Sequence, residues 1–492
     1  MPMLLSEATR ARLTPAERLP ALPVPSRIVS NGEFSPPPQS AALRRYEGRM
    51  LERGRASWRG PLAMAAAFGA LNESFGDAVT PAPFAVAEEE DVDPERAGAE
   101  RDRLRHQFVF DDQVHFLKDD ADPDIFTPLT GLIEVSADLL GLPLGGGRFR
   151  IDDIKFAQFV TDIYLASDTK VALLSGAPSD DPRGAMLSND AMAAARDAVN
   201  EVAKGRRLLT HAVLTPGHPG WLEEMDRVHA ELRPDGWKAY TVGEPFSPSI
   251  YRWRLDDEAL MYPAYQKMVD AGVTRFAIHK GLLPADPDLM PGAEAYAGID
   301  DLAQAARDWP QIDFIIYHAA YRTIPQPTEG ELARFEATGR IDWVSDLAEL
   351  PAKYGLTNIY ADTAASFAFT VLTHPRLAAA MIGTLRAGLG DDRVFWGTDS
   401  VWYGSPQWQI EALRRLRMPD DLQARFGWSD LGEADGAFKA GMLGLNAAPK
   451  YGLDPADYAG AGLETAHLDA VTEAWHARGG GPSNLRYGYA AP

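Results

Sequence analysis

The sequence predicts an α/β fold: a (β/α)₈ barrel with an N-terminal helical extension and long insertions on its catalytic face. Eight short runs rich in Val, Ile, Phe and Tyr recur along the chain, and longer segments with helical spacing separate them. Strands that alternate with helices form a parallel sheet with right-handed crossovers. Eight such units over roughly 300 residues suit a closed barrel better than an open, doubly wound sheet.

The expected strands are short apolar runs, and the expected helices have apolar residues at helical spacing. The strands are predicted at 107–111, 170–175, 207–214, 237–242, 274–279, 313–318, 358–362 and 393–397. The helices between them are predicted at 190–203, 221–232, 259–270, 299–308, 343–350 and 376–387.

Two connections are longer than the usual loop and helix of a barrel unit. The first runs from Phe116 to Thr169 and contains a predicted amphipathic helix at 151–165. The second, 284–297, follows the fifth strand and is punctuated by Pro and Gly. Insertions after strands lie on the catalytic face of a barrel, so both are expected to form lids or pocket walls.

The barrel is expected to occupy residues 106–453. Residues 1–105 form an extension with predicted helices at 41–55 and 61–75, and its charged stretch at 88–103 is expected to be a solvated linker or an exposed helix. This extension is expected to wrap the barrel or to contribute to a subunit interface. Residues that follow the barrel, 454–492, form a C-terminal extension with a helical stretch at 463–477.

Composition limits the partners and the cofactor. The 492 residues carry a formal net charge of −22, which argues against a nucleic-acid partner because a phosphate backbone would be repelled. The chain has no cysteine, so a metal must be held by imidazole, carboxylate and amide or water oxygen. The apolar run 61–71 is too short to span a bilayer. A cytoplasmic enzyme with a small-molecule substrate and no membrane partner is expected.

Polar residues follow several expected strands, at the end of the barrel where active sites are assembled. Gln113 and His115 come after the first strand, two residues apart, and are expected to point to the same side. His279 ends the fifth strand, His318 ends the sixth, and Asp399 follows the eighth. One such residue alone is more often a packing or capping residue. Together, two or three imidazoles and a carboxylate suit a divalent metal with an open coordination position.

The segments FVFDDQVHF, FAIHKGL, IIYHAAYR and VFWGTDS, in this order, resemble the amidohydrolase-2 family, which includes aminocarboxymuconate-semialdehyde decarboxylase-like enzymes. Gly444–Ala448, followed by Tyr451 and Gly452, resembles the C-terminal helix of that family. The resemblance covers residues 106–453. It implies a barrel with one divalent ion, usually Zn²⁺ and sometimes Mn²⁺, and often a homodimer.

Position by position, the resemblance implies that His115, His279 and Asp399 are metal ligands, and that Asp399 also takes part in catalysis. His318 would be the general acid or base, a role that suits an imidazole because its pKa lies near neutral pH. The family has His-x-His on the first strand, whereas this chain has Gln113 in the first position. Gln113 is therefore a candidate metal ligand or substrate contact, or it leaves His115 as the sole ligand of that strand. An amide oxygen is a harder ligand than imidazole, which makes Mn²⁺ an alternative to Zn²⁺.

Four further residues are candidate substrate contacts. Arg322, on the loop after the sixth strand, is suited to a substrate carboxylate or to a surface salt bridge. Lys280 follows a predicted ligand and in a regular strand would point the other way, into packing or a salt bridge. Trp402 and Tyr403 are candidate walls of an aromatic pocket, or core residues. Lys238, on the fourth strand, lies where related binuclear enzymes carry a carboxylated lysine, although the missing histidine favours one metal.

Three functions remain open at this point. The leading hypothesis is metal-dependent hydrolysis of a C–N or C–O bond in a small organic substrate, with water as the nucleophile and His318 carrying the proton. The alternative is non-oxidative decarboxylation of an aromatic or unsaturated carboxylic acid by the same ligand set. The third, motivated by Gln113, is an inactive barrel with a binding role.

Overall fold

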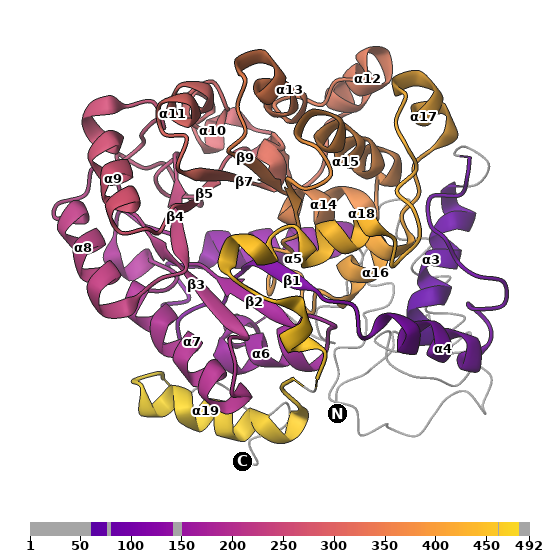
Figure 1. Cartoon of the computed structure of the whole chain (residues 1–492), viewed down its shortest axis with the longest axis horizontal. Coiled ribbons are helices and arrows are strands. Elements are labelled where there is room, and N and C mark those ends of the chain that lie inside the picture. Colours follow the sequence, from indigo (N-terminus) through magenta and orange to yellow (C-terminus); the bar gives the residue numbers. More distant parts are fainter. Residues whose placement is uncertain (1–60, 76–79, 141–149, 461, 482–492) are drawn as a thin grey trace.

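Eight parallel strands form one sheet at the centre of the molecule. The structure is a computed structural model that describes residues 61–75, 80–140, 150–460 and 462–481. The strand order is β1-β2-β3-β4-β5-β7-β9-β10, and helices surround the sheet (Figure 1). The strands are β1 (Phe110–Val114), β2 (Val171–Leu174), β3 (Leu208–Val213), β4 (Gly236–Tyr240), β5 (Arg275–His279), β7 (Asp313–Tyr317), β9 (Ile359–Asp362) and β10 (Val394–Phe395).

The sheet closes on itself between β1 and the segment after β10. Val114 pairs in parallel with Ser400. The backbone nitrogen of Asp399 donates to the carbonyl of Gln113 at 2.9 Å. A closed ring of eight parallel strands with helices outside is the TIM-barrel arrangement, so the predicted fold class is confirmed. The closure also brings Gln113 beside Asp399, because Gln113 lies on β1 and Asp399 lies in the segment after β10 that pairs with it.

Helices cover the outside of the barrel and bury their apolar faces against the strands. Those at the predicted positions are α7 (Asn189–Ala203), α8 (Trp221–Leu232), α9 (Glu258–Asp270), α11 (Leu302–Asp308), α13 (Val344–Tyr354) and α15 (Pro375–Leu389). The structure adds α5 (Thr127–Leu140), α10 (Glu294–Ala297), α12 (Glu329–Thr338), α14 (Ala364–Val371), α16 (Gln407–Arg415), α17 (Asp420–Phe426) and α18 (Ala437–Ala440). Their ends follow local rules: Ser188 caps α7 by accepting from the backbone nitrogen of Ala191 at 3.1 Å.

The first strand lies later in the chain than the predicted 107–111. It runs from Phe110 to Val114, and all five of its residues are buried, although three of them are polar. Its register with β2 is irregular between Asp111 and Val114. The prediction was wrong here because consecutive polar residues are typical of the end of a strand, whereas this strand carries them into the barrel.

The first insertion is broken rather than one helix at 151–165. It contains a 3₁₀ turn (Ile151–Ile154), α6 (Phe156–Val160) and a π-helical turn (Thr161–Leu165). Phe156 stacks on Trp475 of α19 (Leu468–Ala477), with 4.6 Å between the ring centroids. The C-terminal extension therefore packs against the loop that follows β1. In the second insertion, β6 (Leu283–Pro284) pairs with β8 (Thr323–Ile324) beside the barrel.

The N-terminal extension contributes two described helices, α3 (Pro61–Phe75) and α4 (Pro94–Leu104), which lie on the same side of the barrel as α16 (Figure 1). The helix predicted at 61–75 is confirmed as α3, and part of the charged stretch 88–103 forms α4. The helix predicted at 41–55 lies outside the described residues. Within the described ranges, no helix has the length and apolarity that crossing a membrane requires.

Candidate metal centre

His115 directly follows β1, and its ring orientation is fixed on one side. Its Nδ1 lies 2.6 Å from the carbonyl oxygen of Ser175, so Nδ1 carries the proton and donates to that oxygen. This leaves the Nε2 lone pair free, as a metal ligand requires. The ring stacks on Trp402, at 5.7 Å between centroids and 11° between planes.

His115 Nε2 and two polar atoms beside it form a small triangle. His115 Nε2 lies 3.0 Å from Asp399 Oδ1. The carboxamide nitrogen of Gln113 lies 3.1 Å from Asp399 Oδ1 and 3.3 Å from His115 Nε2. Donor atoms that share one ion at about 2.1 Å lie about 3.0–3.4 Å apart. The three groups are therefore spaced like one face of a coordination shell.

Gln113 is the unusual member of this triangle. Its Oε1 is buried and has no hydrogen-bond partner among the residues that the structure describes. Half a turn of the carboxamide exchanges its nitrogen and oxygen, which have nearly the same shape. Oε1 would then face Asp399 and His115 as a third ligand. The set fits a divalent metal with one imidazole, one carboxylate and one amide oxygen, and such oxygen-rich sets suit Mn²⁺ better than Zn²⁺.

The ligand role of His279 stays a prediction, because its ring contacts His318 beside the triangle. Its Nδ1 faces Nε2 of His318 at 3.1 Å, and its ring stacks on Tyr240 at 4.7 Å. Accordingly, no group of three His, Asp or Glu side chains is arranged to hold a metal in the described part of the chain. A centre at this place depends on Gln113 as the third ligand.

His318 lies beside the triangle at the end of β7. Its Nε2 is 3.4 Å from the carboxamide nitrogen of Gln113, and its Nδ1 is buried without a hydrogen-bond partner in the described ranges. His318, Ala319 and Ala320 all have positive φ, at 63°, 50° and 55°. Such strained backbone in non-glycine residues persists only where the surroundings enforce it. Burial lowers the pKa of His318 and of His279 well below the usual range, so both rings are neutral near pH 7.

A pair of buried carboxyl groups below the triangle was missed by the sequence analysis. Burial raises the pKa of Asp362 to about 7, and burial together with the charge of Asp362 raises the pKa of Asp112 well above its usual range. A Cβ on Gly397 would lie 2.2 Å from Asp362 Oδ2, so only glycine permits this close approach. The signal was available for Asp362, which is the last residue of the predicted seventh strand.

Lys238 is the basic side chain that influences the pKa values of Asp112 and Asp362. Its Nζ is fully buried and has no hydrogen-bond partner in the part of the chain that is described. It lies 3.6 Å from the ring centroid of Tyr317 and 4.7 Å from that of Tyr240. Its charge lowers the pKa of Asp112 and Asp362, although burial has the larger, opposite effect. Burial also lowers the pKa of Lys238 itself well below its usual range, and the charges of Asp399, Asp362 and Asp112 oppose this effect.

We expect Asp362→Asn to change how stability depends on pH. The pKa of Asp362 is about 7 in the folded protein and near 3.8 as an ordinary carboxyl group, so folding favours the protonated form. Its contribution to stability is therefore complete at low pH and is lost as the pH rises through 7. Urea unfolding from about pH 4 to about pH 8 should show Asp362→Asn gaining stability relative to wild type. If the difference in free energy of unfolding between Asp362→Asn and wild type does not change with pH, the raised pKa of Asp362 is contradicted.

Two of the predicted substrate contacts are engaged elsewhere. Lys280 Nζ lies 2.8 Å from both carboxylate oxygens of Asp301 and is fully buried, which is the expected salt bridge and not a substrate contact. Arg322 Nη2 pairs with Glu294 at 3.1 Å, and its guanidinium lies over the ring of Trp343. This is the salt-bridge alternative for Arg322. In both cases a carboxylate from another segment, Asp301 before α11 or Glu294 of α10, pairs with the cation.

We expect Lys280→Met to lower the free energy of unfolding by about 3–5 kcal/mol, because it leaves Asp301 as an uncompensated buried charge. Arg322→Ala is the matched control. Its ion pair is partly exposed, so its loss should cost no more than about 1 kcal/mol. Urea denaturation of both variants measures these values. A Lys280→Met protein that is as stable as wild type but has a raised KM would restore the substrate-binding role.

The two aromatic candidates differ in position. Trp402 stacks on His115 and is 6% exposed, so it lies against the metal centre. The ring of Tyr403 packs on Phe369 of α14 at 5.4 Å, which places it in the packing between helix and loop. Trp402 therefore stacks directly on the triangle, and Tyr403 lies close enough for the charge of Asp399 to help burial raise its pKa.

No protein-family model matches this chain, and no curated protein matches it. Solved structures are similar over about 70% of it. An uncharacterised TIM-barrel protein from Bordetella bronchiseptica is 13% identical, with 70% of this chain and 99% of that chain covered and a TM-score of 0.43. The 5-carboxyvanillate decarboxylase of Novosphingobium aromaticivorans, complexed with manganese and 4-hydroxy-3-methoxy-5-nitrobenzoic acid, is 15% identical, with coverages of 71% and 97% and a TM-score of 0.42. The 2,6-dihydroxybenzoate decarboxylase of Rhizobium is 15% identical, with coverages of 70% and 99% and a TM-score of 0.36. At these identities the likeness concerns the fold.

Proposed function

We propose that this chain is a metal-dependent decarboxylase of a small aromatic carboxylic acid, and that it belongs to the amidohydrolase-2 family, which its motifs resemble. The observation that carries the proposal is the triangle of Gln113, His115 and Asp399 at the open end of the barrel. These residues would hold one divalent ion, with Mn²⁺ favoured by the amide oxygen. When bound, the ion supplies a fixed positive charge that holds and polarises an anionic substrate.

The side chains around the triangle support an aromatic acid as substrate. Trp402 and His115 stack nearly parallel, and Tyr240 stacks on His279 across the barrel mouth, so flat rings surround the triangle. Decarboxylation breaks the bond between the ring carbon and the carboxyl group, and a proton takes the electron pair that remains on carbon. His318 is placed beside the triangle to relay that proton, which its neutral ring must first take from another group of the site. The Asp112–Asp362 pair keeps a proton in the site near neutral pH.

Hydrolysis of a C–N or C–O bond is the second candidate. The observation that favours it is the neutral state of His279 and His318, which burial enforces, because a neutral imidazole accepts a proton from an attacking water. Both reactions use the same residues. They differ in whether a proton is finally delivered to carbon or to a leaving nitrogen or oxygen.

The test incubates the Mn²⁺-supplemented enzyme with two panels of substrates. One panel contains aromatic carboxylic acids with an oxygen next to the carboxyl group, and the other contains aryl amides and esters. Release of CO₂ from the first panel, lost in His318→Gln, is the expected result. Product release from the second panel alone would replace decarboxylation by hydrolysis. Turnover of neither panel by a metal-loaded protein would contradict the proposed function.

A further inference from the structure

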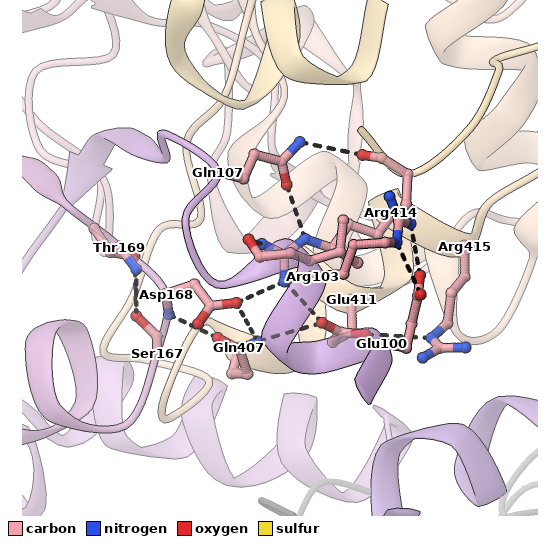
Figure 2. Close-up of polar contacts among 12 residues, drawn as sticks. Glu100, Arg103, Gln107, Ser167, Asp168, Thr169, Gln407, Glu411, Arg414 and Arg415 are labelled. Atoms are coloured by element: carbon pink, nitrogen blue, oxygen red, sulfur yellow. Dashed lines mark hydrogen bonds and ion pairs between the residues drawn. The ribbon is translucent and has the colours of Figure 1, made fainter. Parts of the chain in front are cut away.

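A buried ion-pair network joins the N-terminal extension to helix α16. Figure 2 shows the part of it around Asp168, Glu411 and Arg414. Arg414 pairs with Asp168 at 2.6 Å and with Glu411 at 2.8 Å. Arg415 pairs with Glu411 at 3.2 Å and also with Glu90. All five side chains are buried. The network therefore pairs three carboxylates with the two guanidinium groups at the end of α16.

The extension holds both guanidinium groups. Glu90, which precedes α4, binds Arg415 through both carboxylate oxygens. Arg414 donates to the carbonyl of Leu104, the last residue of α4, at 3.2 Å. It also donates to Gln107, on the way into β1, at 3.0 Å. Residues before the barrel thus fix α16 from outside.

Helix α16 carries this support to the metal centre. Gln409, on α16, is fully buried, and its Nε2 donates to the carbonyl oxygen of Thr398 at 3.0 Å. Thr398 also donates its backbone N–H to Asp111 of β1 at 3.0 Å. The next residue, Asp399, has a positive φ of 57°. Because a non-glycine residue is strained in this conformation, clamping Thr398 from two sides holds Asp399 in place.

We propose that α16 is a positioning element for Asp399, with Glu90 and Gln409 as positioning residues. Glu90 fixes the position of α16 against the extension. Gln409, on the same helix, fixes the position of Thr398 through its hydrogen bond. The inference rests on the proposed metal centre, in which Asp399 Oδ1 must stay near His115 Nε2. It assigns a purpose to the N-terminal extension: keeping the eighth-strand loop in the geometry that binds the ion.

The Glu90→Gln variant is expected to fold. Its partner Arg415 lines a cavity of about 240 Å³ between α3, α4 and α16. Water in this cavity can solvate the guanidinium once the carboxylate is removed. Gln409→Met, which keeps the length of the side chain and removes its donor, breaks the other end of the same link.

The experiment compares these two variants with Glu100→Gln. The control makes the same chemical change in the same extension. It breaks the partly exposed pair with Arg103 and leaves both hydrogen bonds between Glu90 and Arg415 in place. Mn²⁺ affinity is measured by calorimetry on metal-free protein, and amide hydrogen exchange is measured around Asp399 without metal. We expect Glu90→Gln and Gln409→Met to bind Mn²⁺ about tenfold more weakly, as losses of outer-shell partners do. Exchange around Asp399 should also be faster in both, and Glu100→Gln should match wild type.

Wild-type affinity and wild-type exchange around Asp399 in both test variants would overturn the proposal, even if their melting temperatures fall. That result would give the network a purely structural role. If Glu90→Gln does not fold, Gln409→Met decides the question. If the wild type binds no Mn²⁺, the proposed function fails, and the exchange comparison still decides whether α16 positions Asp399.

Discussion

Replacing His318 by glutamine is expected to lower turnover by about 10²–10⁴-fold, the usual worth of a general acid or base. Glutamine keeps a hydrogen-bonding group at this position but cannot exchange a proton near neutral pH. Metal content should not change, because His318 lies outside the Gln113–His115–Asp399 triangle. Steady-state kcat under saturating substrate, together with metal analysis of the same samples, measures both quantities.

His211→Gln is the matched control for this variant. His211 is also a fully buried histidine inside the barrel, but it bonds to the hydroxyl of Tyr451 at 2.9 Å and lies in register with Gly236, at the start of β4. Its loss should lower stability and leave kcat within a small factor of wild type. If His318→Gln keeps the wild-type kcat, or if His211→Gln loses as much activity, the role given to His318 is wrong.

Removing the amide of Gln113 is expected to have the largest effect on metal binding. Gln113→Leu deletes the third donor at nearly constant size, so Mn²⁺ affinity should fall by at least about 100-fold, beyond the range for outer-shell changes. Gln113→Glu should instead strengthen binding, because a carboxylate adds a negative charge to the ligand set. Calorimetric titration of metal-free protein with Mn²⁺ compares the affinities of wild type, Gln113→Leu and Gln113→Glu.

These variants show whether Gln113 binds the metal or only lies beside it. If Gln113→Leu binds Mn²⁺ as wild type does, Gln113 is not a ligand, and the centre reduces to His115 and Asp399. A Gln113→Glu variant weaker than wild type would show that the carboxamide acts through its N–H donors. Melting temperatures of all three proteins control for general damage to β1.

The barrel could be predicted because its signals are local. Apolar runs and helical spacing depend on residues that are near one another in sequence, and α8 was predicted at its observed bounds. Two of the helices that were not predicted lack the usual pattern of one buried apolar face and one exposed polar face. Helix α14 is buried on every side and has no polar face. Helix α16 buries charged residues that other segments neutralise, so it has the composition of an exposed helix.

One missed helix had a readable signal. Thr328 and Glu331 form a capping box at the start of α12, and Gly339 ends it in a left-handed conformation. A Ser or Thr followed three residues later by Glu is a recognised helix start in sequence. Attention to capping patterns, as well as to apolar spacing, would have placed this helix.

The site was predictable only in part, for a related reason. His115 and Asp399 follow strand ends, so the barrel topology alone brings them together. The orientation of His279 toward His318 depends on side-chain packing that spacing does not encode. The partner of Lys280 is Asp301, in a loop 21 residues away along the chain, and no local pattern links the two. Residue positions could be predicted, but their ion-pair partners could not.

Metal analysis of protein purified without added metal tests the central claim most directly. Wild type is compared with the His115→Ala/Asp399→Ala double variant, each after incubation with Mn²⁺ or Zn²⁺ and removal of excess ion. We expect about one equivalent of divalent metal per chain in wild type and none in the double variant. Wild-type protein that takes up neither ion, or a double variant that binds as much as wild type, would contradict it.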